Sequence, residues 1–294
     1  MPGVSRVLVG TCNWSDHKHF YPPGLPAGER LAHYARLFPI VEVDTTFYGI
    51  AKPETGERWA AATPPGFAFN VKAYRSLTLH ERDGTTPRPP TREEERDFMA
   101  LLQPIREAGK LRAVHYQFPP WFKASARNMD FVSRLPDRHP DDQVIVEFRH
   151  RSWAEPERFD VVTELLSEAG MTYCVVDAPQ VGSATMPPHI VVTSPRLAVI
   201  RFHGHNTRKW YVKNARSSTE RFDYLYSEEE LRQWVPRIRD VAAEAEEVHV
   251  LFNNNRSNYA VHNGLQMAHL LELGLPDPGT VPPVVEAEQD ELPL

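Results

Sequence analysis

Eight short apolar runs recur along the chain, with helix-like segments between them. They are residues 6–11, 40–47, 67–73, 111–118, 144–150, 172–177, 197–203 and 247–253. Near-continuous apolar character is typical of parallel strands that are covered on both faces. Eight such strands alternating with helices predict a single-domain α/β protein, a (β/α)8 TIM-type barrel over residues 1–280.

The connecting segments carry signals for helix starts and ends. The patterns Thr-x-x-Glu at 91–94 and Ser-x-x-Glu at 227–230 are capping boxes, which predict helix starts. Pro236 is expected to kink or shorten the second of these helices. The last helix is expected to reach Gly274, where a left-handed residue would end it.

An open dinucleotide-binding sheet is the main alternative fold, and its motifs are missing. The segment after the first run, "GTCNWS", lacks the G-x-G-x-x-G spacing, and no P-loop is present. Two long segments, 76–90 and 204–226, follow strands and are expected on the catalytic face of a barrel. Residues 281–294 are acidic and proline-rich, and we expect them to form an unpacked tail.

The composition indicates a cytoplasmic protein without a membrane partner. No stretch approaches the roughly 18 apolar residues of a membrane span, and the start lacks a signal peptide. A formal net charge of -6 disfavours a dedicated nucleic-acid binder, although it does not exclude a local basic cleft that binds nucleic acid. Cys12 and Cys174 fit buried thiols in a reducing setting, and no sequence feature supplies a base that would make Cys12 a nucleophile.

Polar side chains gather where the predicted strands end. Residues two apart on a strand share a face, and the carboxyl ends of barrel strands meet at one mouth. Trp14 and Tyr48 add aromatic faces of the kind that stack on sugars or nucleobases. The polar candidates are Glu42, Asp44, Lys72, Glu147, Arg149, His150, Asp177, Arg201, His203, Asn253 and Asn254.

Two other interpretations of these residues stay open. They could form a structural ion network, although burying many charges is expensive and an apolar plug is usually no less stable. Carboxylates and imidazoles could also hold a divalent metal. Lys72, Arg149 and Arg201 can neutralise the carboxylates without an ion, and no H-E-x-x-H motif is present, so a metal-free site is favoured. His115 is interpreted as a core histidine.

The blocks "GTCNWSDHKHFYP", "VEVDTTFYG", "FNVKAY", "QFPPWF", "VEFRHRSW", "VVDAP", "RFHGH" and "VLFNNN" together resemble the YecE-like family, domain of unknown function family 72. The resemblance implies a TIM-type barrel related to sugar isomerases and apurinic endonucleases, without a settled activity. This chain departs from the family pattern at Cys12, Asp44 and Leu225, where serine, asparagine and arginine are usual. The family positions it carries are Glu42, Lys72, Glu147, Arg149, His150, Asp177, Arg201, His203, Asn253 and Asn254.

The leading hypothesis is an enzyme that transfers a proton on a small polar or anionic substrate, such as a sugar or sugar phosphate. Glu147 would act as base or acid with Glu42 as its counterpart, because two carboxylates in unlike surroundings divide such roles. His203 would shuttle a proton, and Lys72 would help to hold an anionic group. The expected binding residues are Asp44, Arg149, His150, Asp177, Arg201, Asn253, Asn254, Trp14 and Tyr48.

Two alternatives come from other classes. A metal-dependent phosphodiesterase of the endonuclease type would use clustered His, Asp and Glu ligands. A non-catalytic protein would bind a nucleotide, RNA element or partner through the cationic mouth. Fold alone does not decide among these functions.

Overall fold

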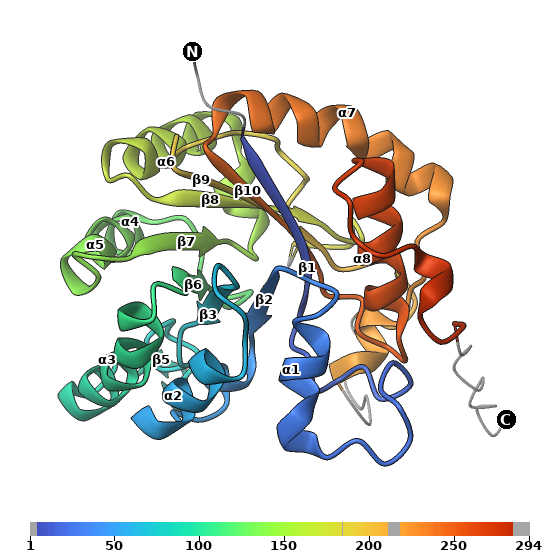
Figure 1. The fold of residues 1–294 in the computed structure, drawn as a ribbon. Helices are drawn as coiled ribbons and strands as arrows, with labels where there is room; N and C mark the ends of the chain where they lie inside the picture. Colours follow the sequence, from blue (N-terminus) through green and yellow to red (C-terminus); the bar gives the residue numbers. More distant parts are fainter. Residues whose placement is uncertain (1–4, 184, 211–217, 285–294) are drawn as a thin grey trace, which may run out of the picture.

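A computed structural model describes residues 5–183, 185–210 and 218–284 (Figure 1). Eight strands form a closed barrel in the order β1-β10-β9-β8-β7-β6-β3-β2, and all neighbours are parallel. This confirms the TIM-type barrel. The strands are β1 (Arg6–Cys12), β2 (Ile40–Val43), β3 (Ala68–Lys72), β6 (Leu111–Gln117), β7 (Gln143–Glu147), β8 (Thr172–Asp177), β9 (Leu197–Phe202) and β10 (Glu247–Phe252).

Helices surround the barrel (Figure 1) but do not follow every strand. Between β8 and β9, residues 178–183 and 185–196 contain no helix. The expected eightfold alternation is wrong here, because prolines 179, 187, 188 and 195 interrupt helix formation. The helices are α1 (Arg30–Tyr34), α2 (Pro53–Ala61), α3 (Arg92–Glu107), α4 (Ala126–Ser133), α5 (Leu135–Arg138), α6 (Pro156–Glu168), α7 (Glu228–Glu244) and α8 (Tyr259–Leu270).

Both capping boxes form, at Thr91 before α3 and at Ser227 before α7. The expected shortening at Pro236 is wrong: α7 continues through it, and its buried face on both sides of the proline packs into the core. The last helix ends at Leu270, short of Gly274. No helix in the described part of the chain is long and apolar enough to cross a membrane.

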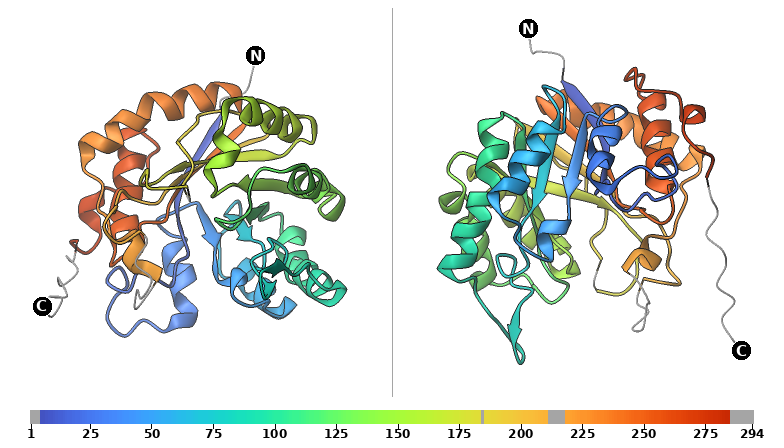
Figure 2. Two further views of the ribbon diagram at one scale, coloured as in Figure 1. Left: turned by 180° about the vertical axis from the view of Figure 1, so that it is seen from behind. Right: turned by 60° about the horizontal axis from the view of Figure 1, so that its bottom comes forward.

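The long segment after β3 contains a small antiparallel hairpin that the sequence did not predict. It pairs β4 (Arg82–Asp83) with β5 (Thr86–Pro87). In the right view of Figure 2 this hairpin extends away from the barrel. It therefore adds surface beside the carboxyl ends of the strands.

Short 3-10 turns occur in several of the connections around the barrel. Two of them lie directly after strands that carry site residues: η2 (Thr45–Phe47) after β2 and η3 (Arg151–Ala154) after β7. The remaining turns are η1 (Ala27–Glu29), η4 (Ser218–Phe222) and η5 (Pro278–Thr280).

Two apolar cores hold the barrel together. The larger lies between the strands and the helices, and the smaller fills the barrel with residues such as Leu8, Ile145 and Val199. Strands β1 and β2 approach closely at Gly10, where a Cβ atom would lie 2.2 Å from the carbonyl oxygen of Ile40. The inner core thus supports the layer of charged side chains above it.

Part of the expected tail is packed onto the domain. Val281 is buried, and His262 Nε2 donates to the carbonyl oxygen of Pro282, 2.6 Å away. Residues 285–294 of that predicted tail lie outside the described residues.

Candidate functional site

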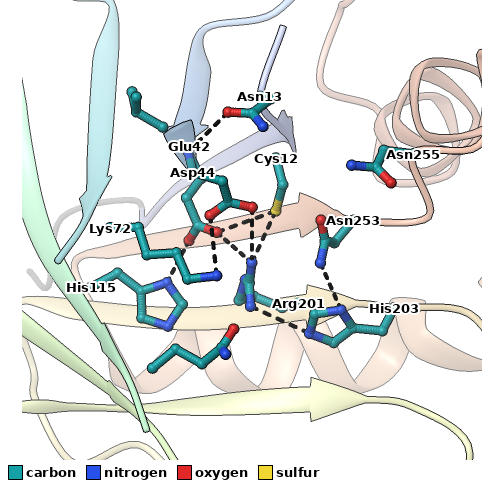
Figure 3. A network of polar contacts seen from close by, with 12 residues as sticks. Cys12, Asn13, Glu42, Asp44, Lys72, His115, Arg201, His203, Asn253 and Asn255 are labelled. Atoms are coloured by element: carbon teal, nitrogen blue, oxygen red, sulfur yellow. Dashed lines mark hydrogen bonds and ion pairs between the residues drawn. The ribbon is translucent and has the colours of Figure 1, made fainter. Parts of the chain in front are cut away.

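Arg201, near the end of β9, is the centre of the polar layer inside the barrel (Figure 3). Its guanidinium donates to Glu42 Oε1 through one terminal nitrogen and to Glu147 Oε2 through the other, both at 2.5 Å. All three side chains are completely buried. Since a guanidinium always carries its charge, it fixes both carboxylates in place.

His115, from β6, also links the two carboxylates. Its Nδ1 lies 2.8 Å from Glu42 Oε2, and its Nε2 lies 3.3 Å from Glu147 Oε2. Cys12 Sγ is 3.3 Å from Glu42 Oε1 and Cys174 Sγ is 3.7 Å from Glu147 Oε2, so each carboxylate has a thiol neighbour. Strand parity explains the arrangement, because these side chains all point into the barrel.

The outer edge of the layer retains some contact with solvent. Arg149 forms an ion pair with Glu147 and donates to Gln117 Oε1 at 3.0 Å. Lys72 Nζ lies 3.6 Å from Asp44 Oδ1. The side chains of Lys72, Asp44 and Arg149 are 10%, 12% and 12% exposed, in contrast to the sealed centre.

His203 lies between the centre and this edge. Its Nε2 is 3.2 Å from an Arg149 nitrogen and 3.3 Å from an Arg201 nitrogen, and its Nδ1 is 2.8 Å from the Asn253 amide. Burial, together with both arginines, holds the pKa of His203 well below its usual value. The imidazole is therefore neutral and a weak proton acceptor while the arginines stay in place.

The two central carboxyls are held ionised. Burial opposes their ionisation, but Arg201 and His115 keep the pKa of Glu42 below its usual value. Burial is likewise outweighed at Glu147, where Arg149 and Arg201 keep the pKa well below its usual value. Burial lowers and Glu42 raises the pKa of His115, and the net shift is upward, which favours the imidazolium. Groups this close titrate as one unit.

Asp44 behaves differently from the central pair. Burial raises its pKa, and nearby Glu42 adds to the rise, while Lys72 opposes it. Its Oδ1 accepts no hydrogen bond within the described part of the chain, although its backbone N–H donates to Asn13 Oδ1 at 2.9 Å. Asp44 is therefore the carboxylate most easily neutralised.

The cluster carries an excess of positive charge. Four cationic side chains face three carboxylates, so one positive charge remains when every carboxylate is ionised and His115 is protonated. The cations are Lys72, Arg149, Arg201 and His115, and the carboxylates are Glu42, Asp44 and Glu147.

Several predicted site residues lie outside this cluster. Asp177 accepts from Tyr226 Oη at 2.7 Å and lies 2.9 Å from His205 Nε2, so it holds the loop after β9. Asn254 donates to the carbonyl oxygen of Tyr224 and to Asn263. These contacts stabilise the loop and leave neither side chain facing the cluster.

The other three candidates also contact local structure. His150 accepts from the backbone N–H of Ser152 and caps η3. The Trp14 ring packs edge-on against Trp59 at 5.6 Å. Tyr48 is 65% exposed on the surface beyond β2. None of these is brought into the charged layer.

The predicted site residues did not include four members of the layer: Cys12, His115, Gln117 and Cys174. His115 and Gln117 are two apart at the end of β6, and Gln117 is paired in register with Glu147. The i, i+2 spacing was the signal that could have included His115 among the candidates.

Two groups of ligand-type side chains are close enough to hold a cation. In each, the ligand atoms lie within 4.8 Å of one another: His115, Glu147 and Cys174, and Cys12, Glu42 and Asp44. Arg201 already bonds to one carboxylate of each group. The donor sets fit a metal poorly, because a guanidinium competes for the same oxygens.

A cavity of about 760 Å³ lies beside α1 and the segment after α8. Residues 18–23, 33, 36, 37, 276 and 280–282 line it. It contains none of the charged residues of the cluster.

Fold and site define an α/β-barrel protein with a buried ion cluster at the carboxyl ends of its strands. Residues 8–286 match the family described as "Protein of unknown function DUF72". The chain belongs to this family.

Relatives and solved structures agree. UPF0759 protein YunF of Bacillus subtilis (strain 168) is 33% identical over 269 residues, covering 91% of this chain and 95% of that protein. UPF0759 protein YecE of Escherichia coli (strain K12) is 24% identical over 280 residues, covering 85% of this chain and 93% of that protein. Crystal structures of DUF72 family proteins from Enterococcus faecalis V583 and Thermotoga maritima MSB8 are also similar. The first has a TM-score of 0.82, 28% identity, and coverage of 96% of this chain and 100% of that one. The second has a TM-score of 0.77 and 32% identity, and the match covers 91% of this chain and 99% of that one.

Proposed function

We propose that the protein binds a small anionic ligand of the sugar-phosphate kind at the edge formed by Lys72 and Arg149, and transfers a proton on it. The observation that carries this proposal is the positive excess of the cluster, combined with the partial exposure of these two cations. A phosphate or carboxylate group on the ligand would balance the charge.

The arrangement around Glu147 supports a link between binding and chemistry. Its Oε2 is fixed by Arg201, while its Oε1 is covered by Arg149 and lies 3.8 Å from His203 Nε2. An anion that draws Arg149 toward it would remove positive charge from Glu147, raise the basicity of that carboxylate and uncover Oε1. Glu147 would then accept the proton from the ligand. Glu42 and His115, which lie in the same cluster, would influence how readily Glu147 ionises.

The choice of sugar phosphates as probes is an analogy from the expected relation of the fold to sugar isomerases. The roles assigned to Glu42 and His203 stay predictions, as does the cytoplasmic location. A metal-dependent phosphodiesterase is less favoured because Arg201 competes for the carboxylates.

Calorimetric titration with ribose 5-phosphate tests the binding step. Lys72→Met or Arg149→Met should weaken binding about 10- to 150-fold, because each removes charge-assisted hydrogen bonds. Arg134→Met is the matched control: Arg134 pairs with Asp130 on the surface, at 67% exposure, and its loss should leave binding unchanged. Equal affinity of the three variants would contradict the proposal.

Glu147→Gln tests the chemical step. This variant should keep ligand binding and lose turnover of a sugar phosphate identified by screening. If the variant does not fold, Glu147 is structural. Saturable binding without turnover in the wild type would instead indicate a binding protein, and stoichiometric zinc or manganese by elemental analysis would promote the phosphodiesterase.

A further inference from the structure

A strip of aromatic rings leads from the charged edge to the surface. Lys72 Nζ lies over the Phe47 ring at 5.1 Å, and Phe47 packs edge-on against His80 at 4.7 Å. His80 in turn contacts Trp121 at 5.8 Å, and Tyr48 contacts Phe47 at 5.2 Å. We call Tyr48, Phe47, His80 and Trp121 the aromatic strip.

The strip is assembled from three loops that follow neighbouring strands. Phe47 and Tyr48 come after β2, His80 after β3 and Trp121 after β6, and these strands are adjacent in the barrel. Tyr48 is 65% exposed and Trp121 is 40% exposed. Large aromatic side chains left open to solvent beside a polar site are typical of surfaces that stack flat ligands.

Positive charge accompanies the strip along its length. Lys72 stands at its inner end, and the guanidinium of Arg82 from the hairpin lies over Trp121 at 4.6 Å. Burial, with Lys72 and Arg149 nearby, lowers the pKa of His80 to about 3, so this ring stays neutral. The strip therefore offers neutral rings between two cations.

His80 also offers a hydrogen-bond acceptor. Thr78 Oγ1 lies 3.2 Å from the carbonyl oxygen of Arg75 and 2.8 Å from His80 Nδ1, so when the hydroxyl donates to that carbonyl it accepts from Nδ1. The proton is then on Nδ1, and Nε2 carries a lone pair. Nε2 has no partner among the residues that the structure describes, which leaves it available for an amino or hydroxyl group.

We infer that the anionic ligand is a mononucleotide: its phosphate contacts Lys72 and Arg149, and its base stacks on the aromatic strip. This inference rests on the proposed function and names its substrate class. A sugar phosphate alone uses the cations but lacks a flat base, the group that stacks on aromatic rings through its π-face. A long nucleic acid is a poorer fit, because the chain has a formal net charge of -6 and binding along a backbone needs many basic contacts.

Titrations with adenosine 5′-monophosphate, ribose 5-phosphate and adenosine separate the contributions of ring and phosphate. Adenosine 5′-monophosphate should bind more tightly than either of the others. Trp121→Ala should weaken its binding about 5- to 150-fold, since stacking on one aromatic side chain contributes that much. Trp121→Phe retains a ring and should retain most of the affinity. Val161→Ala, which alters an exposed apolar side chain on α6, is the control.

The outcomes distinguish this inference from the proposed function. Equal affinity for adenosine 5′-monophosphate and ribose 5-phosphate, unchanged in Trp121→Ala, overturns the nucleotide assignment while the anion site stands. Binding of neither phosphate overturns both. The assignment is supported if Trp121→Ala binds adenosine 5′-monophosphate more weakly than the wild type, Trp121→Phe restores that affinity, and neither change affects ribose 5-phosphate.

Discussion

Replacing Arg201 by methionine tests whether the buried cluster is held together by charge. Methionine keeps an unbranched apolar side chain and removes the guanidinium that bonds to Glu42 and Glu147 at 2.5 Å each. The three side chains are 0% exposed, so water does not replace the lost donors. Arg201→Met therefore leaves two carboxylates short of a partner in the interior.

The expected loss of unfolding free energy is about 3–5 kcal/mol, the usual cost of breaking a buried ion pair. His115 remains beside Glu42, and Arg149 remains beside Glu147, which places the expected loss near the lower value. At about 2 °C per kcal/mol for a chain of this size, the melting temperature should fall by about 6–10 °C. Urea unfolding followed by circular dichroism measures the free energy directly.

The pH dependence of the unfolding free energy should differ between the two proteins. In the wild type the pKa values of Glu42 and Glu147 are held low, so their stabilisation is complete above the ordinary carboxyl pKa of about 4.3 and is lost as the pH falls below it. In Arg201→Met the positive charge that offsets the burial of Glu42 and Glu147 is gone, so their pKa values should rise. The variant should therefore gain stability as the pH falls from about 7 toward 5. The difference between the two proteins should therefore shrink in acid.

Arg134→Met provides the comparison, because its pair with Asp130 is 67% and 56% exposed. A surface pair of this kind contributes about 0–1 kcal/mol. A cluster held together by charge is refuted if Arg201→Met loses no more stability than Arg134→Met, or keeps the pH slope of the wild type.

Other positions give equally definite expectations. Gly10→Ala should cost about 1–3 kcal/mol, because its Cβ would lie 2.2 Å from a carbonyl oxygen of β2. Gly28→Ala, with open space around it, should change stability by less than about 0.5 kcal/mol. Tyr226→Phe should cost about 1–3 kcal/mol, because its hydroxyl serves two buried polar groups. Cys12 and Cys174 are buried, and burial together with the nearby carboxylates raises both thiol pKa values although Arg201 lowers them, so neither should react with a thiol reagent before unfolding.

Each of these has a clear contrary result. Equal melting temperatures for the two glycine variants would mean that β1 and β2 are less close than described. A stability of Tyr226→Phe no lower than that of Tyr224→Phe, whose hydroxyl bonds to the partly exposed Glu230, would remove the loop-holding role. Rapid reaction of native thiols would show that the barrel interior is open.

The fold could be predicted because buried parallel strands are apolar on both faces and therefore stand out as runs. For the same reason, the sequence does not show which alternate residues of a strand face the barrel interior. On β8 the inward positions are Cys174 and Val176, so Asp177 falls on the outer face. Directly after β10, likewise, Asn253 contacts the cluster while Asn254 bonds to the loop. A shift of one residue along the strand turns a side chain from the inner to the outer face, and a strand that is apolar on both faces gives no pattern that shows which residues point inward.

Long-range pairing explains the rest of the difference. His115 alone looks like a core histidine, and its role depends on two carboxylates on β2 and β7 that only the closed barrel brings to it. The hairpin after β3 consists of two-residue strands, too short to give a periodic signal. Burial of Glu42 and Glu147 also depends on what covers the mouth, which strand patterns do not encode.

A crystal structure of the protein with bound ribose 5-phosphate tests the central claim most directly. The phosphate should lie within hydrogen-bonding distance of both Lys72 and Arg149, with Arg149 drawn away from Glu147. A phosphate bound instead in the cavity beside α1, with the Arg149–Glu147 ion pair intact, would contradict the claim.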